Sequence, residues 1–259
     1  MHNLKDVTFM IPVKLDSDDR KTNLRITLNY LHRHFDTNII VYESDEESNE
    51  EFIRSLTDKP IHYMYEKIKD GIFHRTRLLN EMTIVADTKI IANYDADVIL
   101  EPFQYIHAQK LINERDIDMV MAYQGPCLDI PKDQFHLVEE DRIREIDPKK
   151  CTLMNPMSVG GAVFHNKEKY LEAGLENERF VSWGYEDNER VLRLEKLGQK
   201  LARTHGYCWH LTHSRDMNGW FDNPYIQQNK DEFAKIQNLN EADLKEYVNT
   251  WNYGHISQE

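Results

Sequence analysis

The stretch KIIANYDADVIL (residues 89–100) decides the fold. It begins as an apolar run typical of a buried strand and leads directly into two carboxylates, Asp95 and Asp97. A carboxylate beside a buried strand is unfavourable unless it is paired or binds a metal ion. Because ligands of open α/β sheets bind at the carboxyl ends of the strands, we predict a strand that delivers Asp95 and Asp97 to a ligand site.

Strand and helix patterns alternate around this stretch. Apolar, β-rich runs predict strands at 7–13, 38–44, 61–66 and 117–123. Helical spacing of apolar residues predicts helices at 20–35, 49–57, 75–87 and 102–114. This alternation is typical of an α/β protein with a largely parallel central sheet.

The second half of the chain is less regular. We predict a helix and a long loop within 125–158, a strand within 159–166, helices at 167–174 and 186–198, two short strands within 199–214, and two helical patterns near 224–236 and 241–251. The sequence contains no repeat, low-complexity tract or Gly/Ser linker. A single domain over residues 1–259 is therefore expected.

Composition limits the classes of function. The chain has 259 residues, 40% hydrophobic and 10% aromatic, and this is a globular composition. A net charge of −13 argues against a nucleic acid or an anionic membrane as the main partner. The three cysteines show no C-x-x-C spacing, and no apolar stretch approaches the roughly 18 residues of a membrane span. We expect a cytoplasmic protein with reduced thiols, without a signal peptide or transmembrane segment.

Two histidines in HLTH (210–213) are candidate metal ligands. Histidines at i and i+3 can bind one ion on a helix or a turn, and carboxylate oxygens suit Mg²⁺ or Mn²⁺, ions that usually bridge the phosphates of a nucleotide. Each pattern alone is weak evidence for a metal site. Asp-X-Asp, for example, recurs at 16–18 and 116–118. An Asp-capped turn and two packed or surface histidines stay open as alternatives.

Two adjacent carboxylates, Glu186 and Asp187, occur in WGYEDNE (183–189). Acidic residues in the first turn of a helix interact favourably with the helix dipole, so they can be an ordinary helix start. They can also form an acid/base site, because one carboxylate in a partly dry site suffices as a general base.

Six blocks follow one another as in the β-1,4-galactosyltransferase family. They are IPVK (11–14), GIFHRTRLLNEM (71–82), YDADVI (94–99), VGGAVFHNKEKYLEAG (159–174), WGYEDNERVLRL (183–194) and HSRD (213–216). The chain also resembles the GalNAc-transferring half of bacterial chondroitin polymerases, over roughly residues 7–220. The resemblance implies a metal-dependent, inverting glycosyltransferase of the GT-A fold, with a Rossmann-like sheet and helices on both faces. Residues 1–100 would form a nucleotide-sugar-binding half, and residues 101–259 an acceptor-binding and catalytic half.

The resemblance assigns metal ligands first. Asp97 and His213 resemble the metal-binding residues of the family, and Asp95 resembles the companion near the donor ribose and sugar. His210 stands where the animal enzymes place a methionine ligand. Imidazole in place of a thioether makes the site harder, so Mg²⁺ is expected to serve as well as Mn²⁺.

Donor and catalytic positions follow from the same resemblance. Asp187 resembles the catalytic base, and Glu186 resembles a residue that contacts the donor or acceptor sugar. The positions that resemble the donor site are Pro12, Lys14, Phe73, Arg75, Ser158, Gly160, Gly161 and Trp183. Among these, Lys14 replaces a common arginine, and Trp183 resembles the tryptophan of a mobile loop.

The resemblance implies a UDP-sugar donor and a glycan or lipid-linked saccharide acceptor, in bacterial surface polysaccharide synthesis. Ser158 stands where the family tends to carry a bulky aromatic near C2 of the sugar, which favours GalNAc, with galactose next. A sugar-phosphate nucleotidyltransferase is an alternative, but it would need a Gly-rich basic loop where this chain has VKLDSDDRK (13–21). A non-catalytic glycan-binding protein is a second alternative, against which Asp97, Asp187 and His213 argue.

Overall fold

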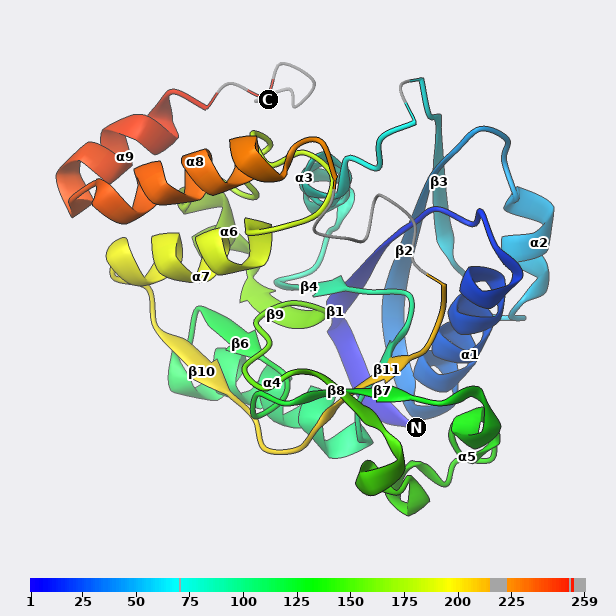
Figure 1. The fold of residues 1–259 in the computed structure, drawn as a ribbon. Helices are drawn as coiled ribbons and strands as arrows, with labels where there is room; N and C mark the ends of the chain where they lie inside the picture. Colours follow the sequence, from blue (N-terminus) through cyan, green and yellow to red (C-terminus); the bar gives the residue numbers. More distant parts are fainter. Residues whose placement is uncertain (70, 215–222, 252, 254–259) are drawn as a thin grey trace.

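The computed structural model describes residues 1–69, 71–214, 223–251 and 253. A seven-stranded sheet forms its centre, with helices on both faces (Figure 1). The strands, in sheet order, are β10 (Leu201–Arg203), β6 (Met119–Met121), β9 (Ala162–Asn166), β4 (Ile90–Tyr94), β1 (His2–Val13), β2 (Phe35–Asp45) and β3 (His62–Lys67). β9 runs antiparallel to its neighbours β4 and β6, and the other pairs of this sheet are parallel. The predicted α/β class with a largely parallel sheet is confirmed.

Side chains of β1 point alternately into two hydrophobic cores, one on each face of the sheet. Phe9 packs edge-on against Tyr94 and Phe164 on the face covered by α1 (Asp18–His34) and α4 (Pro102–Arg115). Met10 belongs to the opposite cluster, with Leu78 and Leu79 of α3 (Arg75–Val85), beside α6 (Lys167–Glu172). Because successive side chains of a strand point to opposite faces, one apolar strand supports both layers of helices.

Three helices pack together at one side of the molecule. They are α7 (Glu186–Lys196), α8 (Ile226–Asn238) and α9 (Glu241–Asn249), drawn yellow to red in Figure 1. Ile236, Leu244 and Val248 form a small core between them. The remaining helices are α2 (Glu50–Ser55), α5 (Phe135–Glu139) and the 3₁₀ turns Lys132–Gln134, Ile143–Glu145 and Pro148–Lys150. Within the described part of the chain, no helix has both the length and the apolar character needed to cross a membrane.

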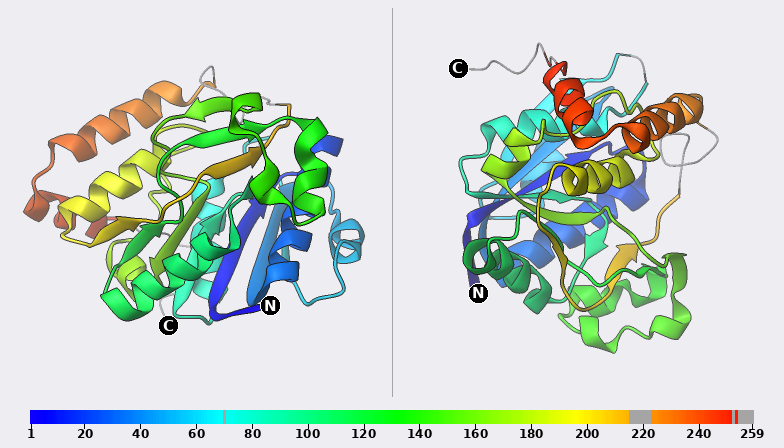
Figure 2. Two further views of the ribbon diagram at one scale, coloured as in Figure 1. Left: turned by 90° about the horizontal axis from the view of Figure 1, so that it is seen from below. Right: turned by 90° about the vertical axis from the view of Figure 1, so that its left-hand side faces the viewer.

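A second, smaller sheet lies beside the main one (Figure 2, left, green and gold). Its strands, in order, are β5 (Val98–Ile99), β11 (Cys208–Leu211), β7 (Cys127–Ile130) and β8 (Thr152–Asn155). Two predictions are corrected here. The single strand expected over 89–100 breaks at the Asp-Ala-Asp turn and enters both sheets, and the region 125–158, predicted as helix and loop, contributes two strands. The helices and short strands predicted from residue 159 onward are confirmed.

Candidate functional site

Strand pairing brings the three predicted metal ligands together. β5 pairs antiparallel with β11, which places Val98 opposite His210 and brings Asp97 beside both histidines. Asp97 Oδ2 lies 3.6 Å from His210 Nε2 and 3.1 Å from His213 Nε2. One ligand atom from each of the three residues lies within 4.8 Å of the others. Ligand atoms that share one small divalent ion at about 2.1 Å lie roughly 3 Å apart, so the cluster fits such an ion after small adjustments.

A fourth residue orients this cluster. β7 pairs with β11 so that Asp129 lies opposite His210, and Asp129 Oδ1 is 2.7 Å from His210 Nδ1. A proton on Nδ1 donated to this carboxylate leaves the lone pair of Nε2 free to bind a metal. Burial alone would raise the pKa of Asp97, but His210 and His213 hold it well below its usual value, so Asp97 is ionised, as a metal ligand would need to be. Asp129 was missed by the sequence analysis, since its segment was expected to be irregular.

Arg75 joins the strand-end carboxylates to the acidic pair of α7. Its Nη2 lies 2.7 Å from Asp95 Oδ1, and its Nη1 lies 3.5 Å from Asp187 Oδ1. The side chain of Arg75 is only 13% exposed, so these ion pairs are shielded from solvent. Burial raises the pKa of Asp95, and the nearby Asp97 and Asp187 carboxylates add to the rise against the opposing effect of Arg75. The two motifs that stood far apart in sequence therefore form one continuous site.

The glycine pair before β9 lies between these carboxylates. Gly161 has a φ of +80°, a left-handed conformation that favours glycine, and its carbonyl accepts a hydrogen bond from Asp95 N at 2.8 Å. A Cβ at Gly160 would lie 1.9 Å from Asp187 Oδ2. These glycines resemble donor-site positions in sequence, and in the structure Gly160 packs directly against the Asp187 carboxylate.

The adjacent carboxylates of α7 have opposite electrostatic environments. Glu186 is 6% exposed, and burial together with Asp187 raises its pKa to about 7. Burial opposes ionisation of Asp187 too, but Arg190 and Arg75 outweigh it and lower the pKa of that carboxyl. Asp187 is therefore ionised at neutral pH, whereas Glu186 holds its proton to a higher pH than an ordinary glutamate. Neighbouring carboxyl groups whose pKa values are driven apart are typical of acid/base sites.

Glu186→Gln should change stability in a pH-dependent way. The pKa of Glu186 is raised from 4.5 to about 7, so its stabilising contribution is present below about pH 4.5 and is lost as pH rises through 7. Glutamine does not ionise and so removes this pH dependence of stability. The difference between the two pKa values corresponds to roughly 3 kcal/mol in the free energy of unfolding. Thermal unfolding should show a higher midpoint than wild type at about pH 8 and no gain near pH 4.5. Glu195→Gln, on the exposed side of α7, is the control, and equal shifts in both variants would contradict the account.

A strained turn leads into the acidic pair. Ser182, Gly184 and Tyr185 have φ values of 60°, 117° and 72°. Gly184 N donates to Glu186 Oε2 at 2.8 Å, and the backbone carbonyl of Trp183 accepts a hydrogen bond from Asn223 Nδ2 at 2.9 Å. Non-glycine residues in the left-handed region need surrounding structure to hold them, and such residues cluster at functional sites. Trp183 is partly exposed on this turn.

The remaining predicted positions surround the same edge of the sheet. Pro12 lies in β1 near its carboxyl end, and Lys14 Nζ just beyond it is 3.5 Å from Asp16 Oδ2. Phe73 precedes α3 and packs against the core beneath that helix. Ser158 Oγ lies 3.4 Å from the hydroxyl of Tyr123. Of the HSRD block, residues 215 and 216 lie outside the described part of the chain.

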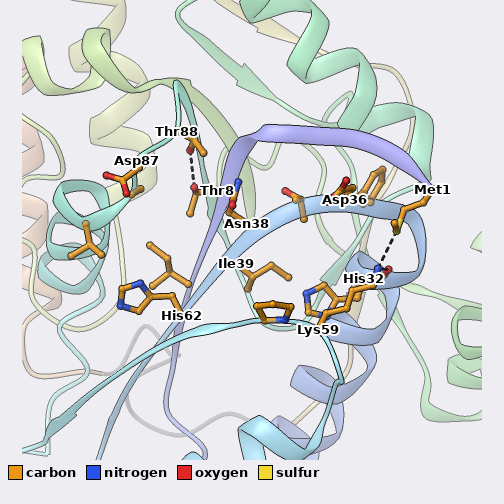
Figure 3. A pocket seen from close by; sticks show the side chains of 16 residues that line it. Met1, Thr8, His32, Asp36, Asn38, Ile39, Lys59, His62, Asp87 and Thr88 are labelled. Carbon is orange, nitrogen blue, oxygen red and sulfur yellow. Dashed lines mark hydrogen bonds between the residues drawn. The ribbon is translucent and has the colours of Figure 1, made fainter.

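A cavity of about 420 Å³ lies elsewhere, along the amino-terminal ends of β2 and β3 (Figure 3). Its lining includes His32, Asp36, Lys59 and His62, and none of the predicted site residues. The hydroxyls of Thr8 and Thr88 at its wall bond each other at 2.7 Å. Because ligands of α/β sheets bind at the opposite, carboxyl ends of the strands, this cavity does not mark the candidate site.

Comparison with known proteins identifies the fold. A scan against protein-family models and a search of curated proteins both found no match. Among solved structures, the chain is similar to the catalytic domain of Drosophila β1,4-galactosyltransferase 7 in complex with xylobiose, with a TM-score of 0.52 and 15% identity over 93% of this chain and 84% of that one. The fold is that of GT-A glycosyltransferases.

A second GT-A structure agrees. The mannosyltransferase PcManGT from Pyrobaculum calidifontis, solved with GDP-Man and Mn²⁺, matches with a TM-score of 0.55 and 14% identity over 94% of this chain and 73% of that one. The predicted GT-A fold is confirmed. At these identities the likeness concerns the fold, so the activity has to be argued from the side chains of the site.

Proposed function

We propose that this protein is a divalent-metal-dependent glycosyltransferase that moves a hexose or N-acetylhexosamine from a UDP-sugar to a glycan hydroxyl. The observation that carries the proposal is the convergence of Asp97, His210 and His213, with ligand atoms within 4.8 Å of one another. Arg75 connects this cluster through Asp95 to the Asp187 carboxylate. The similar solved structures support the same class, since one is a complex with GDP-Man and Mn²⁺ and the other a complex with xylobiose.

Each part of the site has a role in this reaction. Held by Asp97, His210 and His213, Mn²⁺ or Mg²⁺ would act as a Lewis acid for the negative charge that develops on the leaving diphosphate. The acceptor oxygen bonds to the anomeric carbon, the bond from that carbon to the diphosphate oxygen breaks, and Asp187 takes the hydroxyl proton. Attack on the face opposite the diphosphate inverts the anomeric configuration. Glu186, with a pKa of about 7, can donate or accept a hydrogen bond at a sugar hydroxyl.

The donor assignment rests on Ser158. Its backbone N donates to Gly125 O at 2.9 Å, and its hydroxyl lies beside Tyr123, which in turn donates to Gly160 O at 2.5 Å. This contact places the small side chain next to the glycine that supports Asp187. A small residue here leaves room for an N-acetyl group at C2, so we propose GalNAc first and galactose next.

Ser158→Tyr should shift donor choice toward the plain hexose. Wild type is expected to prefer UDP-GalNAc over UDP-Gal, by the roughly 10- to 200-fold that pocket size alone supplies. Competition between UDP-GalNAc, UDP-GlcNAc, UDP-Gal and UDP-Glc measures the preference in both proteins. Met157→Tyr is the control, because Met157 is 60% exposed and should tolerate an aromatic ring. A wild-type preference for UDP-Gal or UDP-Glc that Ser158→Tyr leaves unchanged would refute the assignment.

Calorimetry of UDP binding tests the nucleotide and metal parts of the proposal together. UDP should bind with Mn²⁺ or Mg²⁺ present and lose affinity when EDTA removes the ion. Binding that is equally tight in EDTA would contradict the metal site. We further propose a cytoplasmic role in bacterial surface polysaccharide synthesis, with a glycan or lipid-linked saccharide as acceptor.

A further inference from the structure

A buried pair of opposite charges lies behind the Asp187 carboxylate. We propose that Glu176 and Arg190 are positioning residues that hold Asp187 ionised and aimed over Gly160. The inference rests on the proposed function, in which Asp187 takes the proton of the acceptor hydroxyl.

Arg190 bridges two carboxylates. It lies three residues after Asp187 on α7, and its Nη2 is 2.6 Å from Asp187 Oδ1. Its Nη1 is 2.8 Å from Glu176 Oε1, and its Nη2 also donates to Val159 O at 3.3 Å. The side chains of Arg190 and Glu176 are 0% and 1% exposed, so water does not screen the pair. The planar guanidinium thus fixes one oxygen of Asp187 relative to the chain segment that leads into Gly160.

Glu176 is itself anchored to the central sheet. Its Oε1 accepts a hydrogen bond from Asn93 Nδ2 at 2.8 Å and another from the hydroxyl of Tyr170. Asn93 lies in β4, two residues before Asp95. The network therefore ties Asp187 to the same strand that delivers Asp95 and Asp97.

Stability alone does not explain this pair. Removing two charges from water is unfavourable, and buried ion pairs can often be replaced by apolar side chains without loss of stability. Glu176 Oε2 and Arg190 Nε are buried and make no hydrogen bond within the described residues. The pair therefore leaves part of its hydrogen-bonding capacity unused. The pair contacts the Asp187 carboxylate, whose side chain is 26% exposed to solvent, and this contact gives the pair a role at that carboxylate.

The charges around Asp187 determine in which direction its pKa should change when a neighbour is replaced. Arg190 at 2.6 Å and Arg75 at 3.5 Å favour the ionised form. Glu186 and Asp95 oppose it, and the buried Tyr123 hydroxyl is a further titratable neighbour. Arg190 is the closer partner of Asp187, at 2.6 Å against 3.5 Å for Arg75. Weakening the Arg190 contact should therefore raise the pKa of Asp187 and free its carboxylate to rotate.

The same helix supplies a matched control pair. Arg193 Nε is 2.7 Å from Glu189 Oε1, and these side chains are also 0% and 1% exposed. The guanidinium of Arg193 donates in addition to the carbonyls of Ala173 and Leu175, away from the acidic pair. Any effect common to both pairs reflects stability, and an effect confined to Arg190 reflects positioning of Asp187.

The test compares Arg190→Lys with Arg193→Lys. A lysine keeps the charge but has no fork to bridge two carboxylates. We expect both variants to lose thermal stability, and only Arg190→Lys to lower kcat, by about 10- to 100-fold with little change in the KM for the donor. The acidic limb of the pH–rate profile of Arg190→Lys should move to higher pH. Glu176→Gln should do the same more weakly, and Glu189→Gln should not.

Two kinetic outcomes would overturn the inference. One is equal loss of kcat in the two lysine variants without a shift of the pH profile, and the other is normal kcat and pH profile in Arg190→Lys. Thermal unfolding tests the Arg190–Asp187 contact without measuring sugar transfer. The changes in unfolding midpoint caused by Arg190→Lys and Asp187→Asn should be non-additive in the double variant, whereas those of Arg193→Lys and Asp187→Asn should be additive. Additive changes for Arg190 would contradict the contact. Failure of the wild type to transfer any sugar would instead refute the proposed function.

Discussion

Asp97→Ala and His213→Ala should each abolish metal-dependent binding of UDP. Asp97 Oδ2 lies within 3.6 Å of both histidine nitrogens, so its loss removes the one carboxylate of this three-residue cluster. Residues that only orient metal ligands typically account for 10- to 100-fold in affinity, so loss of a ligand should exceed about 100-fold. Because protons compete with the metal for the histidines, wild-type affinity should also fall between about pH 8 and 5.5. Calorimetry of Mn²⁺ and UDP binding measures both effects.

A second Asp-X-Asp in the chain provides the control. Asp116 pairs with Lys200 on the surface and is 84% exposed, so Asp116→Ala should bind Mn²⁺ and UDP as wild type does. His210→Ala should weaken binding without abolishing it. Metal binding by Asp97→Ala that matches wild type, or affinity in wild type that does not change with pH, would contradict histidine and aspartate ligation.

Asp187→Asn should lower the rate of sugar transfer by at least about 100-fold, the usual scale for a lost general base. Asparagine retains the shape of aspartate and an oxygen that can accept from Arg190, whose Nη2 lies 2.6 Å from Asp187 Oδ1. UDP and metal affinity should therefore remain close to those of wild type. Initial rates with a competent acceptor, together with UDP calorimetry, separate the chemical step from binding.

The neighbouring Glu186→Gln variant is the control for this experiment. Its side chain is buried and accepts a hydrogen bond from Gly184 N, which glutamine can also accept. We expect a smaller loss of transfer than in Asp187→Asn. Near-normal turnover in Asp187→Asn would contradict the base assignment, and a larger loss in Glu186→Gln would transfer that role to Glu186.

The alternation of strands and helices could be predicted from sequence because it depends on local periodicity. The break within 89–100 could not, since Val98 and Ile99 continue the apolar run of β4 although they pair with β11 in another sheet. The strand CLDI (127–130) has four residues and gains its structure from pairing with β11, about 80 positions away in the chain. Short strands that form by pairing with distant segments leave little pattern in their own sequence from which they could be predicted.

The same limit applies to the site. Asp97, His210 and His213 could be proposed because their residue types suit a metal and their order resembles a known family. Asp129 could not, because its function depends on lying opposite His210 across two strands. Arg190 was missed because charged residues on a helix usually face solvent, and Glu176 was missed because it lies in the loop between α6 and α7. Only the packing of the folded chain shows that both are buried.

The most direct test of the account measures which product leaves the donor. The protein is incubated with Mn²⁺, a panel of UDP-sugars and saccharide acceptors, and in parallel with UTP and sugar 1-phosphates, and UDP and pyrophosphate are quantified. The account predicts release of UDP from an N-acetylhexosamine donor, stimulated by acceptor and lost on addition of EDTA. Release of pyrophosphate from UTP would contradict it in favour of a nucleotidyltransferase, and UDP-sugar binding without UDP release for any acceptor would contradict it in favour of a non-catalytic glycan-binding protein.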